Sequence, residues 1–217
     1  MPVIARLRRA ARGEQGFTLV EMGVATFLST LVLGAVVLVV NAVGQNASDA
    51  RQRADLQVQA REVVTEMAAE LRAAEAPQIT MSAIASLAES ALTFYSDRYD
   101  FPGPEKIVYE RTACAGEYCQ LRVRRYAADP ASAPNWVYLT LPFNDVVLLE
   151  RVAATPAMFA GSKWAGSPLE RTTVPSCGGA TACNFPIVTI VLRAAPPGVS
   201  TIEGPFELLV EVNLRNA

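Results

Sequence analysis

One uninterrupted apolar run dominates the N-terminal part of the chain. It covers the 24 residues from Phe17 to Val40, and its only charged residue is Glu21. As a helix it is about 36 Å long, enough to cross a hydrocarbon core of about 30 Å. Four arginines precede it, at positions 6, 8, 9 and 12. Because basic flanks stay in the cytoplasm, the pattern predicts a single-pass membrane helix with everything after Val40 outside. A plain signal anchor is the simplest interpretation.

The pattern then changes to that of an amphipathic helix. Apolar residues recur at spacings of three and four, at Leu56, Ala60, Val63, Val64, Met67, Leu71 and Ala74. We expect this helix to end near Ala76, since Pro77 disfavours helical geometry in the residue before it. An acidic stripe follows another face, with Asp55, Glu62, Glu66 and Glu70. Two interpretations stay open for this stripe: a solvated face, or a filament contact that needs a basic partner.

Strand-like segments rich in β-branched and aromatic residues follow. They are Ala91–Tyr95, Lys106–Thr112, Gln120–Tyr126, Trp136–Leu141, Val146–Val152, Pro186–Arg193 and Phe206–Leu214. We expect a loop with a short helix at Gln78–Glu89, and irregular structure from Ala153 to Ala182. Strands after one helix predict an α+β fold, in which the C-terminal half of the helix packs on an antiparallel sheet.

Composition narrows the function classes. The chain has a formal charge of −2 and no histidine, so it lacks the usual general base and the commonest zinc ligand. Without residues 1–16, 15 basic and 20 acidic residues remain, a charge of −5, which gives no nucleic-acid-binding signal. We find no nucleophile–base pair and no phosphate-binding glycine loop. The sequence therefore predicts no enzyme and no catalytic residues.

The start of the apolar run carries a specific motif. Gly16-Phe17-Thr18-Leu19-Val20-Glu21-Met22 closely resembles the processing site of type IV prepilins and type II secretion pseudopilins. The resemblance implies that prepilin peptidase cuts after Gly16 and that the new N-terminal residue, Phe17, is methylated. It also implies that Glu21 meets the N-terminal amine of a neighbouring subunit during assembly. The basic leader and the unbroken apolar run agree with this resemblance.

The resemblance also implies an organisation and a function. Residues 1–16 would be a removed leader, 17–40 a transmembrane helix, 41–76 its amphipathic continuation, and 77–217 an extracytoplasmic pilin-like head. The chain would be a minor pilin or a J-type pseudopilin in the cytoplasmic (inner) membrane, which then joins a type IV pilus or a secretion pseudopilus. Its partners would be other pilin subunits, prepilin peptidase, the assembly platform and the lipid bilayer. The alternative is a membrane-anchored adhesin or ligand-binding module with the same anchor.

Four cysteines form two close pairs, Cys114/Cys119 and Cys177/Cys183. Their even number and extracellular placement favour disulfides, and local pairing is the simplest of three connectivities. A zinc site is the alternative, but both intervals are longer than the usual zinc-ribbon spacing.

Asp97, Asp100 and Glu105 are candidate calcium ligands in a turn. Ordinary turn chemistry explains the same residues, and the nearby prolines break known calcium-loop spacings. We therefore expect no cofactor and no metal.

Overall fold

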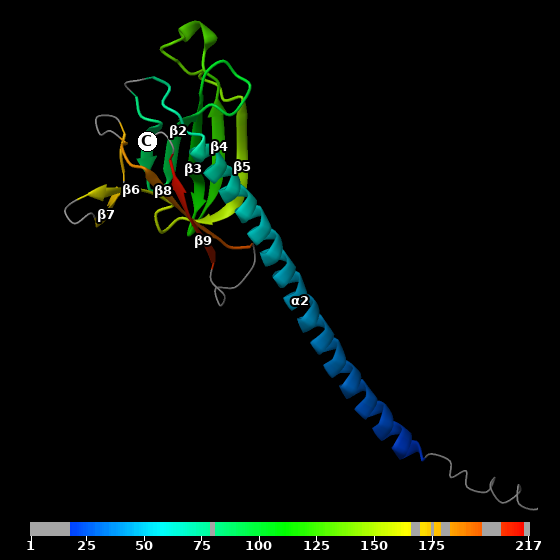
Figure 1. Cartoon of the computed structure of the whole chain (residues 1–217). Coiled ribbons are helices and arrows are strands. Elements are labelled where there is room, and N and C mark those ends of the chain that lie inside the picture. Colours follow the sequence, from blue (N-terminus) through cyan, green and yellow to red (C-terminus); the bar gives the residue numbers. More distant parts are fainter. Residues whose placement is uncertain are drawn as a thin grey trace, which may run out of the picture. The chain divides into compact units, whose positions relative to one another are not determined.

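The computed structural model describes residues 18–78, 81–165, 170–174, 176–178, 183–196 and 205–214 (Figure 1). The chain divides into two compact units, residues 1–50 and 51–217. We describe each unit by itself. The long helix α2 (Leu19–Arg72) begins in the first unit and ends in the second.

In the first unit, α2 exposes all of its side chains. Every described residue from Thr18 to Ala50 is exposed, including large apolar residues such as Phe27 and Leu38. By length and composition alone, α2 is able to cross a membrane; it is the one such helix among the described residues. The predicted apolar helix is therefore present in the structure.

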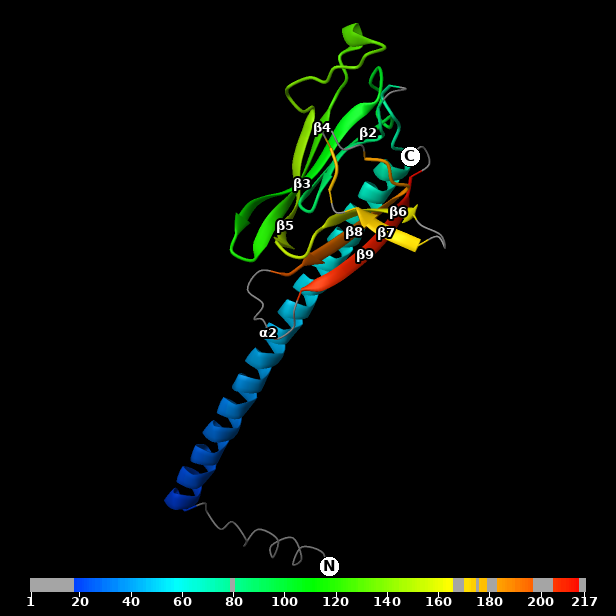
Figure 2. The same cartoon turned by 90° about the vertical axis from the view of Figure 1, so that its left-hand side faces the viewer.

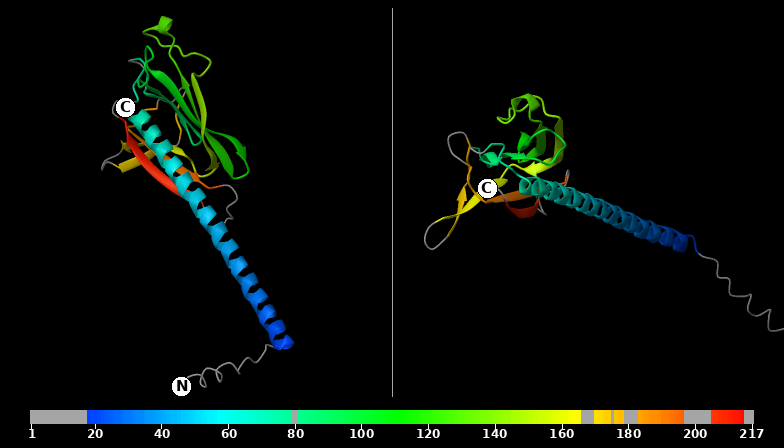
Figure 3. Two further views of the ribbon diagram at one scale, coloured as in Figure 1. Left: turned by 90° about the vertical axis from the view of Figure 1, so that its right-hand side faces the viewer. Right: turned by 45° about the horizontal axis from the view of Figure 1, so that its top comes forward.

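In the second unit, α2 buries the apolar stripe that the sequence predicts. Ala60, Val63, Val64, Met67, Ala68 and Leu71 are buried, and Leu56 packs against the same core. Figure 3 shows this part of α2 lying against the strands. The helix ends at Arg72, slightly before the predicted end near Ala76. The reason is tertiary: the Ser96 hydroxyl donates to the carbonyls of Glu70 and Ala73 (both 3.3 Å), and Ala74 pairs with Ser96.

A nine-stranded sheet forms the rest of this unit. Its strands are β1 (Ile84–Ala88), β2 (Ala91–Ser96), β3 (Glu105–Ala115), β4 (Tyr118–Tyr126), β5 (Asn144–Ala153), β6 (Phe159–Ala165), β7 (Glu170–Val174), β8 (Ile187–Ala194) and β9 (Phe206–Asn213). Every strand pair is antiparallel. The α+β fold of one long helix and an antiparallel sheet is therefore confirmed.

The strands form two groups, inclined to each other in Figures 1 and 2. The first group follows the chain in the order β1-β2-β3-β4-β5. In the second group, β8 lies between β6 and β9, and β7 pairs with β6. The groups meet where Val152 of β5 pairs with Ala194 of β8. Segment 176–178 returns to β1, because Cys177 and Leu87 exchange two backbone hydrogen bonds (2.9 and 3.0 Å).

Three strands lie where the sequence predicts none. β1 replaces the loop with a short helix expected at 78–89, and β6 and β7 lie in the stretch expected to be irregular. β1 and β6 are rich in small residues, whose strand propensity is low, and their pairing partners stabilise them instead. β7 contains β-branched residues but is only five residues long. Packing also selects a small residue at Gly161 of β6, since a Cβ atom there would lie 2.7 Å from the Phe185 ring.

One predicted strand is absent. The segment 136–141 makes only an isolated bridge, between Tyr138 and Ala128, and the chain bends at Thr140 and Leu141. Pro134 and Pro142 flank it and limit how far a ladder can extend. Trp136, expected in the core of a strand, is half-buried and lies against Gly103, whose φ is +92°.

Candidate functional site

The first turn of α2 holds the charged residue that the sequence singles out. The Thr18 hydroxyl accepts a hydrogen bond from the Glu21 backbone N–H (3.2 Å). In return, the Glu21 carboxylate accepts one from the Thr18 N–H (3.4 Å). This reciprocal pattern is a capping box, which satisfies backbone donors that the helix leaves open at its N-terminus. Glu21 therefore has a local partner within its own chain.

The predicted processing residues, Gly16 and Phe17, lie outside the described residues. The other polar side chains of this stretch bond within the helix. Thr26, Ser29 and Thr30 each donate a hydroxyl proton to a backbone carbonyl three or four residues earlier (2.7–3.0 Å). Their polar groups are therefore compatible with an apolar surrounding.

A buried carboxylate joins the C-terminal part of α2 to the sheet. Glu70 is fully buried and accepts hydrogen bonds from the Tyr99 hydroxyl (2.7 Å), the Tyr109 hydroxyl and the Arg125 guanidinium (2.9 Å). Arg125, on β4, is also buried and contacts Glu66 (2.7 Å). Three donors thus surround one carboxylate, as a buried charge requires.

Electrostatics follow from this arrangement. Burial, together with the hydrogen bond and charge of Glu70, raises the pKa of the Tyr99 hydroxyl to about 12. Burial and the charge of Glu70 also raise the pKa of Tyr109. Burial is the largest single influence on the pKa of Arg125 and lowers it, but the charge of Glu70, the two tyrosines and the hydrogen bond to Glu70 together raise it by more, so the net shift is upward. The tyrosines stay protonated donors and Arg125 stays a cation, so the cluster is suited to holding α2 on the sheet.

This cluster corrects the interpretation of the acidic stripe. Asp55 and Glu62 are exposed, but Glu70 is buried, so both sequence interpretations are wrong for it. The sequence does contain a signal. Glu70 falls within the apolar stripe of α2, and Arg125 follows Leu121 and Val123 on the core-facing side of β4. Opposite charges at two core-facing positions indicate that both side chains are buried and need a partner. That Glu70 and Arg125 are each other's partners follows only from the fold.

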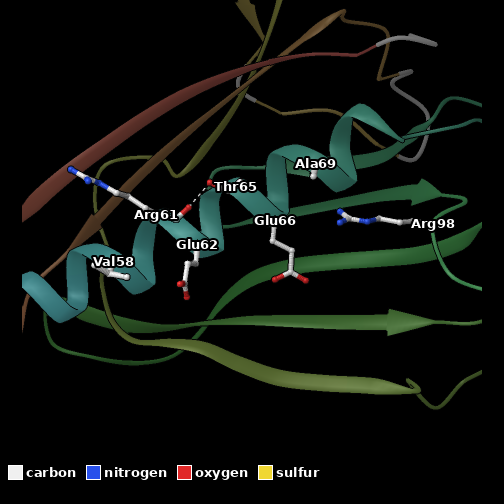
Figure 4. A pocket seen from close by; sticks show the side chains of 7 residues that line it. All are labelled: Val58, Arg61, Glu62, Thr65, Glu66, Ala69 and Arg98. Carbon is white, nitrogen blue, oxygen red and sulfur yellow. Dashed lines mark hydrogen bonds between the residues drawn. The ribbon is translucent and has the colours of Figure 1, made fainter.

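A groove runs beside the same helix surface. It has a volume of about 580 Å³ and is lined by Val58, Arg61, Glu62, Thr65, Glu66, Ala69 and Arg98. Figure 4 shows the carboxylates of Glu62 and Glu66 on one side of the helix, with the Arg98 guanidinium directed toward it. The lining contains both charge signs, but most of its exposed surface comes from apolar atoms.

The three candidate calcium ligands do not converge. Glu105 is buried, and its carboxylate accepts backbone N–H groups of Arg98 and Tyr99 (both 3.2 Å), which shapes the loop after β2. Asp97 and Asp100 are exposed. Among the described residues, no group of acidic or cysteine side chains has the arrangement of a metal site.

Both cysteine pairs form disulfides with the local connectivity. Cys114–Cys119 closes the tip of the β3–β4 hairpin. Cys177–Cys183 ties the segment that pairs with β1. The carbonyl of Cys183 also accepts a hydrogen bond from the Ser82 hydroxyl (2.9 Å). The second disulfide therefore lies where distant parts of the chain meet.

These features define a class: a protein with one apolar helix of membrane-spanning length, whose C-terminal part packs on a disulfide-bonded antiparallel sheet. Comparisons with protein-family models, curated proteins and solved structures find no match to this chain.

Proposed function

We propose that this chain is a minor pilin or pseudopilin, a subunit processed by prepilin peptidase and assembled into a type IV pilus or a type II secretion pseudopilus. The observation that carries the proposal is the motif Gly16–Met22, placed after a basic leader and directly at the start of an apolar helix. A signal anchor needs neither the glycine nor the carboxylate at these positions.

Two structural features support this function. The helix from Leu19 to Ala50 leaves its apolar side chains exposed, so it suits lipid and then the helices of neighbouring subunits. The C-terminal part of the helix is clamped to the sheet by Glu70 and Arg125. We place the mature subunit in the cytoplasmic membrane, with the head outside, before it joins a filament.

The first test concerns processing. We expect prepilin peptidase to cut between Gly16 and Phe17, and Gly16→Glu to leave the precursor at full length. Intact-mass analysis of protein from cells that contain the peptidase measures both. A mature N-terminus at any other residue would refute the family assignment.

The second test separates two roles of Glu21. As part of the capping box, Glu21 is replaceable by Gln, which also suits that position. As the partner of a neighbour's N-terminal amine, it needs its charge. We propose the second role, so Glu21→Gln and Glu21→Leu should both reduce co-purification with other pilin subunits. Membrane levels should stay equal to wild type.

Thr18→Ala is the matched control. It removes the other half of the capping box and keeps the charge, so co-purification should be retained. If Glu21→Gln assembles as wild type does, the carboxylate acts only as a cap. Processing without any partner subunit would instead favour an anchored adhesin or ligand-binding module.

A further inference from the structure

An uncovered backbone edge lies where the sequence predicts a strand. Residues 136–139 are extended beside 127–129. The Val137 carbonyl accepts the Asp129 N–H (2.8 Å), and the Leu139 N–H donates to the Ala127 carbonyl (3.1 Å). The backbone N–H and C=O of Tyr138 point away from residues 127–129, because successive backbone groups alternate in direction along an extended segment. Within the part of the chain that the structure describes, the Tyr138 N–H and C=O have no hydrogen-bond partner.

Side chains of this segment also alternate. The Tyr138 ring stacks on Tyr95 (ring centroids 5.2 Å apart) and so faces the sheet. Val137 and Leu139 face away, with 60% and 50% of their surface exposed. The segment thus presents both unpaired backbone groups and outward apolar side chains.

The edge is short and flanked by Pro134 and Pro142, but it lacks the charged side chains that often protect exposed edges. No charged residue occurs in the 15 residues from Pro130 to Asn144. By contrast, the outward face of β9 carries Glu207 and Glu211, both in ion pairs. Charged side chains are a common means of preventing edge-to-edge pairing. Residues 130–144 therefore lack this barrier to pairing at the edge.

We propose that this edge pairs with the same edge of a second copy of the chain. The segment supplies what its partner needs: an extended backbone, a free N–H and C=O, and no charge to repel an identical segment. An antiparallel pair centred on Tyr138 lets the two Tyr138 residues exchange backbone hydrogen bonds. It places Val137 of each copy opposite Leu139 of the other, a two-fold symmetric contact.

The contact is small. Stable interfaces bury about 1,200–2,000 Å² in total, which one short strand pair does not reach. Pairing should therefore be weak, and detectable where copies are concentrated in a membrane. The proposal goes beyond the proposed function and does not depend on cleavage after Gly16.

Cysteine cross-linking tests the register. Full-length Val137→Cys and Leu139→Cys, with different tags, are co-expressed and mildly oxidised in membranes. Opposed residues at a non-hydrogen-bonded antiparallel position lie about 4.5 Å apart between Cα atoms, within the range that a disulfide spans. The mixed pair should form several-fold more dimer than either variant alone. Peptide mapping of the monomer should still find Cys114–Cys119 and Cys177–Cys183.

Leu209→Cys is the matched control, because Leu209 on β9 is similarly exposed, at 58%. It should give no more dimer than wild type treated in the same way. The proposal is overturned if the mixed pair gives no dimer above wild type. It is also overturned if each variant alone, or Leu209→Cys, cross-links as strongly as the mixed pair.

Discussion

At the scale of single residues, Glu70 and Arg125 explain how the helix is held on the sheet. A buried ion pair adds little stability relative to apolar side chains of the same volume, but breaking one by removing a partner is costly. The side-chain groups that bond the Glu70 carboxylate all donate to it: two tyrosine hydroxyls and a guanidinium. Of these groups the guanidinium can only donate, so it requires an acceptor on α2 at this position.

We therefore predict that Glu70→Gln destabilises the protein by about 3 kcal/mol, since the buried Arg125 would lose its main counter-charge. Urea unfolding of the full chain in detergent measures this. Glu66→Gln is the control: Glu66 also contacts Arg125, but its side chain is 43% exposed, so it should cost less than about 1 kcal/mol. Equal losses of unfolding free energy in the two variants would contradict the role of the buried Glu70–Arg125 pair in holding α2 on the sheet.

A second residue-scale prediction concerns alkaline pH. The pKa of Tyr99 is about 12 in the folded protein, against an ordinary value of 10.0, and the pKa of Tyr109 is also raised. The folded state therefore keeps protons that the unfolded chain releases. The contribution of these two tyrosines to the free energy of unfolding is fully present below pH 10 and is lost as pH rises from 10 to 12.

The double variant Tyr99→Phe/Tyr109→Phe should lose stability less steeply over this range, although it starts less stable. Some slope should remain, because burial also raises the pKa of Tyr95 and Tyr138. Urea midpoints between pH 8 and 11.5 measure the slope. Identical slopes in wild type and variant would exclude Tyr99 and Tyr109 as the source.

At the scale of elements, the two disulfides have different surroundings. Cys114–Cys119 closes an exposed hairpin tip whose strands pair along their length. Cys177–Cys183 holds a short segment whose only strand partner in the described structure is Leu87. By chain entropy, a loop of this length contributes about 2 kcal/mol in either case.

We predict that Cys177→Ser/Cys183→Ser destabilises the protein more than Cys114→Ser/Cys119→Ser. The reason is that the segment at 176–178 then has little to keep it beside β1. Amide exchange at Leu87, whose N–H donates to the Cys177 carbonyl, should become faster in the first variant only. Faster exchange at Leu87 in both variants would show that the hairpin-tip disulfide supports the same edge.

At the scale of the whole molecule, the two units differ in whether their described residues include buried side chains. The buried residues of α2 begin at Ala60, and the hydrophobic core draws on the end of α2 and the strands. Residues 19–50 contribute no buried side chain. The second unit should therefore fold without them.

We predict that a fragment of residues 51–217 is soluble without detergent and unfolds cooperatively, with a melting temperature within a few degrees of the full chain. Circular dichroism and thermal melting measure this, and Glu70→Gln in the same fragment should lower the transition. Aggregation of the fragment, or a transition without cooperativity, would show that the first unit is needed for folding.

An uninterrupted apolar run determined the membrane-length part of α2, and periodic patterns determined its buried stripe and the strands β2, β3, β4, β5, β8 and β9. The reason is that burial of one face leaves a period of 3.6 or 2 in neighbouring residues. The sequence also contains the Thr18–Glu21 capping pattern and the local cysteine pairs. In each of these pairs the two residues lie within a few positions of each other in the sequence.

The tertiary structure decided the rest. β1 and β6 have small residues and weak local preference, so their pairing partners make them strands, while β7 is a five-residue strand that pairs with β6. Residues 136–141 have strong strand propensity but only a short partner, and they remain an edge. Glu70 and Arg125 lie 55 positions apart, and no local pattern joins them. Such contacts depend on which distant segments the fold places together, and a short sequence period carries no information about that.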